Sequence, residues 1–160
     1  MNQYPLVYLD HVQKVYGKHI ALYDVSVNIQ PGRIIGLLGP NGSGKTTIIK
    51  LVNGLLQPTS GNVYIHGEVP SAKTKQVVSY LPDTTYLDEN MKISETIRFF
   101  QDFYNDFNPQ RAYQLLNDLH LHPEQKLKQL SKGNKEKVQL ILVMSREADL
   151  YILDEPFGGV

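Results

Sequence analysis

The chain has no cysteine, no long apolar segment and no net charge, and each absence excludes a class of protein. Without cysteine among its 160 residues it has neither disulfide bonds nor thiolate chemistry, which fits the cytosol. No apolar run approaches the ~20 residues that a membrane-spanning helix needs. The 16 basic and 16 acidic residues cancel, so the composition does not indicate a nucleic-acid-binding surface.

A glycine-rich stretch dominates what is present. Residues 39–47 spell GPNGSGKTT, which matches the P-loop pattern G-x-x-x-x-G-K-[ST]. The apolar run Ile34–Leu38 before it predicts a buried strand, and residues 47–52 after it predict the first turns of a helix. This strand–loop–helix context is the one in which a P-loop functions. The alternative, a glycine-rich turn with a chance lysine, leaves that context unexplained.

The residue types of this loop suit a phosphate. Gly39, Gly42 and Gly44 allow backbone conformations that are closed to other residues, so several N–H groups can converge on one anion. Lys45 supplies a positive charge for the outer phosphates, and the hydroxyl of Thr46 is placed to bind Mg²⁺. The predicted ATP-binding loop consists of Gly39, Pro40, Asn41, Gly42, Ser43, Gly44, Lys45, Thr46 and Thr47.

Hydrophobic periodicity predicts an α/β protein with a helical segment near its middle. Strands are predicted at residues 6–16, 24–29, 62–65, 77–81 and 150–153, and helices at 47–52, 94–104, 109–119 and 133–146. Asn53–Gly54 predicts the end of the first helix, because glycine is favoured just beyond a helix C-terminus. The predicted inward residues are Tyr113, Leu116 and Leu119 on the third helix, and Val138, Ile141, Leu142 and Ser145 on the fourth.

An acidic pair follows the last predicted strand. Asp154 at the end of residues 150–153 could hold Mg²⁺, and Glu155 could polarise a water for attack on a γ-phosphate. Alone, such a pair is more typical of a solvated turn after a strand. Its position behind a P-loop favours the interpretation as a metal and catalytic site.

A second anion-binding stretch is possible at residues 130–135, LSKGNK, just before the last helix. Ser131 and Gly133 at a helix N-terminus could bind an anion through backbone N–H groups and the helix dipole. A plain serine cap is the simpler interpretation of the same residues. Both interpretations stay open on the residues alone.

These stretches together resemble the ATP-binding subunit of an ABC transporter. Residues 39–47 are similar to the Walker A motif, residues 151–156 to the Walker B motif, and residues 130–134 to the signature motif, usually LSGGQ. Three motifs in the family's order, with a helical segment before the signature, make the resemblance specific. It implies a P-loop NTPase with a RecA-like core, an N-terminal antiparallel β-subdomain and an inserted helical subdomain.

The resemblance also implies roles for particular residues. Asp154 would be the Mg²⁺ carboxylate and Glu155 the catalytic glutamate, acting with Lys45. Ser131 and Gly133 would contact ATP that is held by a second subunit. Tyr16, one of ten tyrosines, falls where the family places an aromatic ring that stacks on adenine. By itself this tyrosine is more typical of a core residue.

The implied organisation is one ABC ATP-binding domain. Residues 1–83 would form the β-subdomain and P-loop core, 84–146 the helical subdomain, and 147–160 the Walker B strand of the core. The implied function is to bind MgATP and, as a homo- or heterodimer, to hydrolyse it and drive transport through a transmembrane permease subunit. Such a subunit is cytoplasmic and peripheral to the inner face of the cell membrane, with no nucleic-acid partner.

The sequence departs from the family at several positions. Asp83 stands where a glutamine is usual; its carboxylate can still bind Mg²⁺, so we expect an altered Mg²⁺ dependence. Lys132 and Asn134 replace the usual glycine and glutamine of the signature, and we expect Lys132 to point to solvent.

The largest departure is that no D-loop aspartate and no switch histidine follow the Walker B motif before Val160. We expect the 160 residues to be the N-terminal part of a longer protein, missing the C-terminal part of the core and unable to hydrolyse ATP efficiently alone. Two alternatives stay open: a soluble ABC-type ATPase without a transport role, and a nucleotide-binding module that does not hydrolyse. A P-loop kinase is disfavoured by the signature-like stretch.

Overall fold

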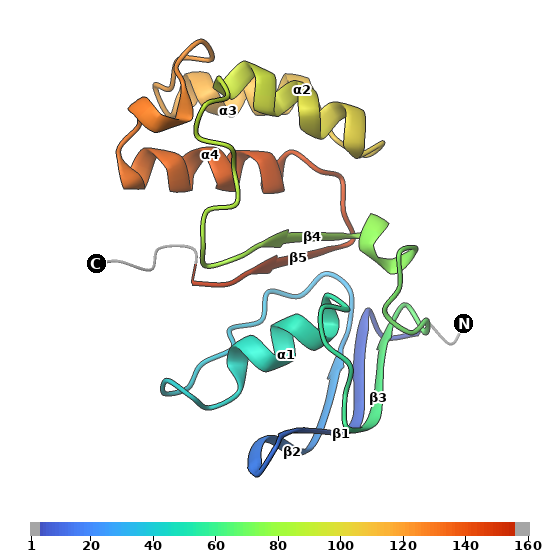
Figure 1. Ribbon diagram of the computed structural model, residues 1–160. Coiled ribbons are helices and arrows are strands. Elements are labelled where there is room, and N and C mark those ends of the chain that lie inside the picture. Colours follow the sequence, from blue (N-terminus) through green and yellow to red (C-terminus); the bar gives the residue numbers. More distant parts are fainter. Residues whose placement is uncertain (1–3, 156–160) are drawn as a thin grey trace. The chain divides into compact units, whose positions relative to one another are not determined.

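The computed structural model describes residues 4–155 and divides into two compact units, Met1–Val78 and Ser79–Val160 (Figure 1). The segment expected to lead into the D-loop, residues 156–160, lies outside the described residues. Within residues 4–155, no helix has the length and apolarity to cross a membrane. The subdomain boundaries expected at residues 83 and 146 remain predictions.

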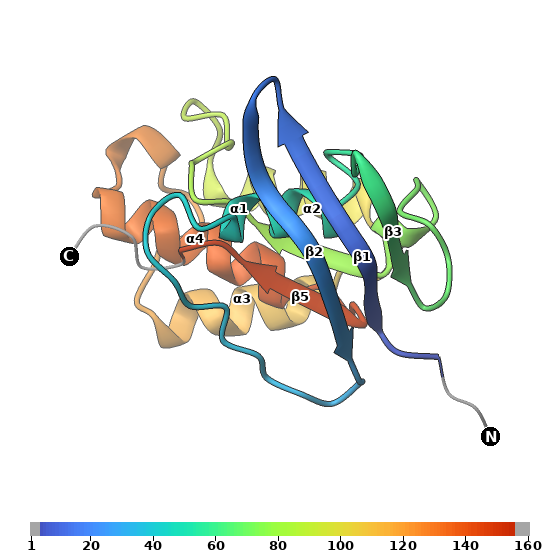
Figure 2. The same cartoon turned by 90° about the horizontal axis from the view of Figure 1, so that it is seen from below.

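Unit 1 contains a three-stranded antiparallel sheet in the order β2-β1-β3, as expected for the N-terminal part (Figure 2). The strands are β1 (Val7–Tyr16), β2 (His19–Ile29) and β3 (Ser60–Ile65). A turn at Gly17, with a φ of 58°, joins the first two. Strand β2 is longer than the predicted 24–29, because its pairing with β1 continues back to His19.

Helix α1 (Lys45–Val52) ends where glycine was predicted to end it. Gly54 adopts a φ of 64°, and its N–H donates to the carbonyl of Leu51 at 3.0 Å. The N–H of Leu55 donates to the carbonyl of Lys50 at 2.8 Å. These two bonds form a Schellman motif, which satisfies carbonyls that the helix itself leaves without partners.

The predicted buried strand at Ile34–Leu38 is wrong. The structure gives these residues no regular secondary structure, and Ile34 and Leu38 are 103% and 91% exposed. An apolar run becomes a strand only when a neighbouring strand accepts and donates its backbone hydrogen bonds. Among the described residues, the sheet strands pair only as β2-β1-β3 and β4-β5, so none pairs with this run.

Unit 2 combines a strand pair with three main helices. Strands β4 (Val78–Leu81) and β5 (Leu150–Leu153) are hydrogen-bonded to each other and run in the same direction (Figure 1). Helices α2 (Ile93–Phe103), α3 (Pro109–Asp118) and α4 (Lys132–Met144) contact one another. Their shared core includes Ile97, Leu116, Val138 and Leu142, all almost fully buried.

The inward face predicted for α4 is confirmed, whereas that of α3 is partly wrong. Val138, Ile141, Leu142 and Ser145 are all buried. On α3 the buried residues are Ala112 and Leu116, while Tyr113 and Leu119 are 44% and 38% exposed. Helix α3 ends at Asp118, so Leu119 no longer continues the helical stripe.

A buried ion pair ties the end of α4 to the start of α3. The Arg146 guanidinium donates from Nε and Nη2 to the two carboxylate oxygens of Asp106, at 3.0 and 2.9 Å. The same guanidinium lies 4.0 Å from the ring centroid of Tyr104. Because Arg146 is buried, the bidentate geometry offsets the cost of removing its charge from water.

We expect Asp106→Ala to destabilise unit 2 by about 3 kcal/mol, because it removes the bidentate carboxylate partner of the buried Arg146 guanidinium. Urea denaturation followed by circular dichroism at 222 nm measures this, since most helical residues lie in unit 2. The control is Glu124→Ala, which breaks the exposed pair with Lys92 and should leave the urea midpoint unchanged. Equal midpoints for Asp106→Ala and Glu124→Ala would show that the buried pair does not stabilise the fold.

Candidate nucleotide-binding site

The P-loop in unit 1 adopts a conformation that requires glycine. Gly42 and Gly44 have φ values of 81° and 93°, in the left-handed region. Between them, the N–H of Ser43 donates to the carbonyl of Pro40 at 3.2 Å and closes a turn. Helix α1 then begins at Lys45, and no side chain caps its N-terminus. The first-turn N–H groups are therefore left to an anion, whose charge the helix dipole favours.

Lys45 brings a positive charge to the rim of the loop. Its ammonium donates to the carbonyls of Gly39 and Pro40, at 2.8 and 2.9 Å. The side chain thus folds back over the loop instead of extending from the helix. A bound phosphate would accept hydrogen bonds from this ammonium in exchange for bonds to neutral carbonyls, and charge-assisted bonds are the stronger kind.

Gly44 also fixes the loop against β2. A Cβ atom at this position would lie 2.6 Å from Cδ2 of Leu22 and 2.8 Å from the carbonyl oxygen of Ala21. Lys14 pairs with Leu22 and Val15 with Ile20, so Ala21 is the extra residue of a β-bulge. The helix N-terminus can approach this bulged strand closely because residue 44 has no side chain.

Tyr16 lies at the end of the hairpin that carries this bulge. It pairs with His19, two residues beyond the Lys14–Leu22 pair, or roughly 7 Å along the strand. Its ring is 43% exposed, and the ammonium of Lys14 lies 5.2 Å from the ring centroid. The alternative of a core tyrosine is therefore wrong: the ring is available at the same end of unit 1 as the P-loop.

We expect Gly44→Ala to destabilise unit 1 by about 2–4 kcal/mol, from left-handed backbone strain and the clash with Ala21 and Leu22. Urea denaturation followed by NMR at the Leu22 amide measures the loss. Gly36→Ala is the control, because its Cβ would meet nothing within 4 Å, and it should change stability by less than about 0.5 kcal/mol. A Gly44→Ala protein as stable as Gly36→Ala would contradict the close approach.

In unit 2, two acidic segments meet at the carboxyl ends of β4 and β5. The N–H of Asp154 donates to the carbonyl of Leu81 at 2.9 Å, which sets the two strand ends side by side. Asp154 is buried, whereas Asp83 and Glu155 are exposed. Tyr80 lies near both aspartates: burial, then the charges of Asp154 and Asp83, raises the pKa of its phenol.

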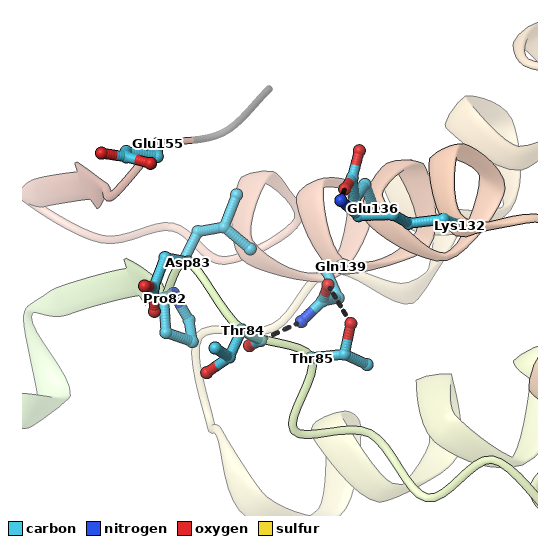
Figure 3. A pocket seen from close by; sticks show the side chains of 9 residues that line it. Pro82, Asp83, Thr84, Thr85, Lys132, Glu136, Gln139 and Glu155 are labelled. Atoms are coloured by element: carbon cyan, nitrogen blue, oxygen red, sulfur yellow. Dashed lines mark hydrogen bonds and ion pairs between the residues drawn. The ribbon is translucent and has the colours of Figure 1, made fainter. Parts of the chain in front are cut away.

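A cavity of about 300 Å³ lies beside these strand ends (Figure 3). Asp83 and Glu155 line it from the strand ends, and Lys132, Glu136 and Gln139 line it from α4. The Lys132 side chain is 76% exposed, as expected, and its ammonium lies 3.8 Å from a carboxylate oxygen of Glu136. The cavity therefore carries mixed charge and joins the Asp83 segment to the first turns of α4.

The signature-like turn at the start of α4 is a serine-capped helix start that stays exposed. The Ser131 hydroxyl accepts a hydrogen bond from the N–H of Asn134 at 3.2 Å, so it is a helix cap. Ser131 and Gly133 are also exposed, and nothing lies within 4 Å of a Cβ built on Gly133. The turn is therefore open to solvent at Ser131 and Gly133.

The donor set suits Mg²⁺ only together with a nucleotide. Residues 4–155 contain no group of three acidic or histidine side chains arranged to hold a metal ion. Mg²⁺ is commonly bound through one or two carboxylates plus substrate phosphates. The predicted ligands Thr46, Asp83 and Asp154 fit that pattern chemically; Thr46 belongs to unit 1 and the two aspartates to unit 2.

One residue that the structure places in this site was not predicted. Gln139 is buried on α4 and contacts the segment after Asp83. The sequence did contain a signal: Gln139 follows the inward residue Val138, at a position that the helical pattern predicts to be buried.

The folds and motifs define a P-loop nucleotide-binding protein, and comparisons with known proteins narrow the class. The family model described as "ABC transporter" matches residues 22–158. The peptide export protein SkfE of Bacillus subtilis, named "SkfA peptide export ATP-binding protein SkfE", is 35% identical over 97% of this chain and 67% of its own length. The manganese transport ATP-binding protein MntB of the same organism is 31% identical over 96% of this chain and 66% of its own length.

A solved structure titled "Structure of ATP binding subunit of ABC transporter" superposes with a TM-score of 0.86 at 29% identity, over 96% of this chain and 67% of that one. The chain therefore belongs to the ABC transporter family and has its P-loop NTPase fold. It spans between 54% and 67% of the length of the first three curated relatives.

Proposed function

We propose that this protein is the ATP-binding subunit of an ABC transporter, which binds MgATP and, in the dimer of the complete encoded protein, hydrolyses it. The observation that carries the proposal is the P-loop of unit 1. Two left-handed glycines, an uncapped helix start and the Lys45 ammonium together form a cradle for phosphate groups. Family membership and the transport-related names of relatives support the same conclusion.

Each site residue has a role in this proposal. The loop N–H groups and Lys45 hold the phosphates, Tyr16 stacks on adenine, and Glu155 orients the attacking water and accepts its proton. Thr46, Asp154 and Asp83 supply oxygen ligands for Mg²⁺. When bound, Mg²⁺ neutralises charge on the phosphate oxygens. Ser131 and Gly133 complete the ATP site of a second subunit, which makes a homo- or heterodimer the active form.

A membrane permease is the proposed second partner, and α2 offers a surface for it. Phe99 and Phe103 are 57% and 68% exposed, and their rings stack with centroids 6.1 Å apart. Phe100, one position along from Phe99, is buried in the helical core. On α2, Phe99 and Phe103 are therefore exposed to a partner, whereas Phe100 is not. In this role the protein lies in the cytoplasm, peripheral to the inner face of the membrane.

We expect Lys45→Ala to weaken ATP binding by at least about tenfold, because it removes a charge-assisted contact to phosphate. Isothermal titration calorimetry with MgATP measures the dissociation constant. Lys50→Ala is the matched control, since it removes the same charge from the exposed last turn of the same helix. Equal weakening by both variants would point to overall charge and not to the P-loop.

We expect Glu155→Gln to lower ATP turnover by at least about 100-fold in the complete encoded protein, because the amide cannot accept the proton of the attacking water. ATP affinity should change less than about threefold. Steady-state phosphate release and MgATP titration measure the two effects separately. Glu147→Gln, an exposed carboxylate outside the cavity, is the control and should keep wild-type turnover; full activity in Glu155→Gln would refute the assigned role.

A further inference from the structure

Gln139 is a buried amide in the middle of α4. Its side chain is only 3% exposed, and its neighbours Val138, Ile141 and Leu142 belong to the buried core. An amide removed from water costs free energy unless hydrogen bonds replace those to the solvent. Its partners therefore indicate why glutamine stands at this position.

Both ends of the amide bind the two residues that follow Asp83. The Thr85 hydroxyl donates to Oε1 at 3.3 Å, and Nε2 donates to the backbone carbonyl of Thr84 at 3.5 Å (Figure 3). The reversed orientation would place Oε1 against the Thr84 carbonyl, so this one arrangement satisfies both groups. The bonds are long, and each contributes less to stability than a bond of 2.9 Å. Together the two bonds define where residues 84 and 85 lie on α4.

Gln139 is the central member of a polar stripe along α4, which we define as Lys135, Gln139 and the carbonyl of Val143. These residues are four apart and so lie on one face of the helix. The Ser79 hydroxyl donates to the Val143 carbonyl at 2.9 Å, and the ammonium of Lys135 pairs with Glu89. The stripe thus follows residues 79–89, from β4 past Asp83, along about two turns of α4.

We propose that Gln139 is a positioning residue for ATP hydrolysis, which holds the Asp83 segment on the helix that the signature turn begins. The inference rests on the proposed function. Through Gln139, Asp83 in the cavity and Ser131–Gly133 at the start of α4 are kept in one rigid arrangement. A change at the signature turn is then transmitted to the carboxylate of Asp83 through α4, with Gln139 as the link.

Four substitutions in the complete encoded protein test this role. Gln139→Leu removes both bonds at similar volume, and Thr85→Val removes one hydroxyl without changing shape. Thr85→Ser keeps the hydroxyl. Thr84→Val is the matched control, because Gln139 bonds to the backbone carbonyl of Thr84 and not to its side chain.

We expect Gln139→Leu and Thr85→Val each to lower kcat for ATP by about 5–10-fold, since small misplacements of site groups can cost up to about two orders of magnitude. KM for ATP should stay within about twofold, because the P-loop belongs to the other unit. The double variant should lose no more than Gln139→Leu alone. Thr85→Ser and Thr84→Val should retain wild-type kcat. Amide exchange in residues 83–90 should accelerate at least about threefold in Gln139→Leu.

The proposal would be overturned by a kcat within twofold of wild type in both Gln139→Leu and Thr85→Val, or by losses that multiply in the double variant. An effect of Thr84→Val equal to that of Thr85→Val would also overturn it. Absence of ATP turnover in the wild-type protein would instead refute the proposed function. In that case the amide-exchange measurement still tests whether Gln139 holds residues 83–90 in place. Unchanged exchange in Gln139→Leu would show that it does not.

Discussion

The packing of α4 is the constraint on which unit 2 depends, because this one helix carries two different kinds of contact. Its apolar residues Val138, Ile141 and Leu142 are buried in the core shared with the other helices. Its polar stripe holds residues 79–89 through hydrogen bonds and an ion pair. Hydrophobic burial supplies most of the free energy, about 25 cal/mol per Å², and does not depend on direction. The polar contacts are directional, so they determine where the Asp83 segment lies.

The proposed anion-binding residues lie at two helix N-termini, one in each unit, and these helix starts are built differently. Helix α1 begins after Gly44 with no side-chain cap, so its first N–H groups have to be satisfied from outside. Helix α4 begins after Ser131, whose hydroxyl already accepts a hydrogen bond from one of the first N–H groups of α4, that of Asn134. The first helix start is therefore suited to hold phosphate continuously, whereas the second is stable by itself. This difference fits a nucleotide held by one subunit and contacted by another.

The sequence predicted those features that depend on local chemistry. Gly54 ends α1 and Ser131 caps α4, because a cap acts on backbone groups within a few residues. The wrong prediction for Leu119 is also a local error, because this residue lies only one position past the end of α3. Gln139 was missed because its partners Thr84 and Thr85 are more than fifty positions away, and periodicity gives no information on such pairs.

The run Ile34–Leu38 shows where local information fails completely. Its composition is that of a buried strand, yet two of its residues are almost fully exposed and none is in a strand. Backbone pairing is a property of two segments, so strand propensity cannot be realised by one segment alone. Helix α1, by contrast, satisfies its own backbone and forms directly beyond the same loop. Within residues 4–155, the loop is held by α1 and by the close approach of Gly44 to β2.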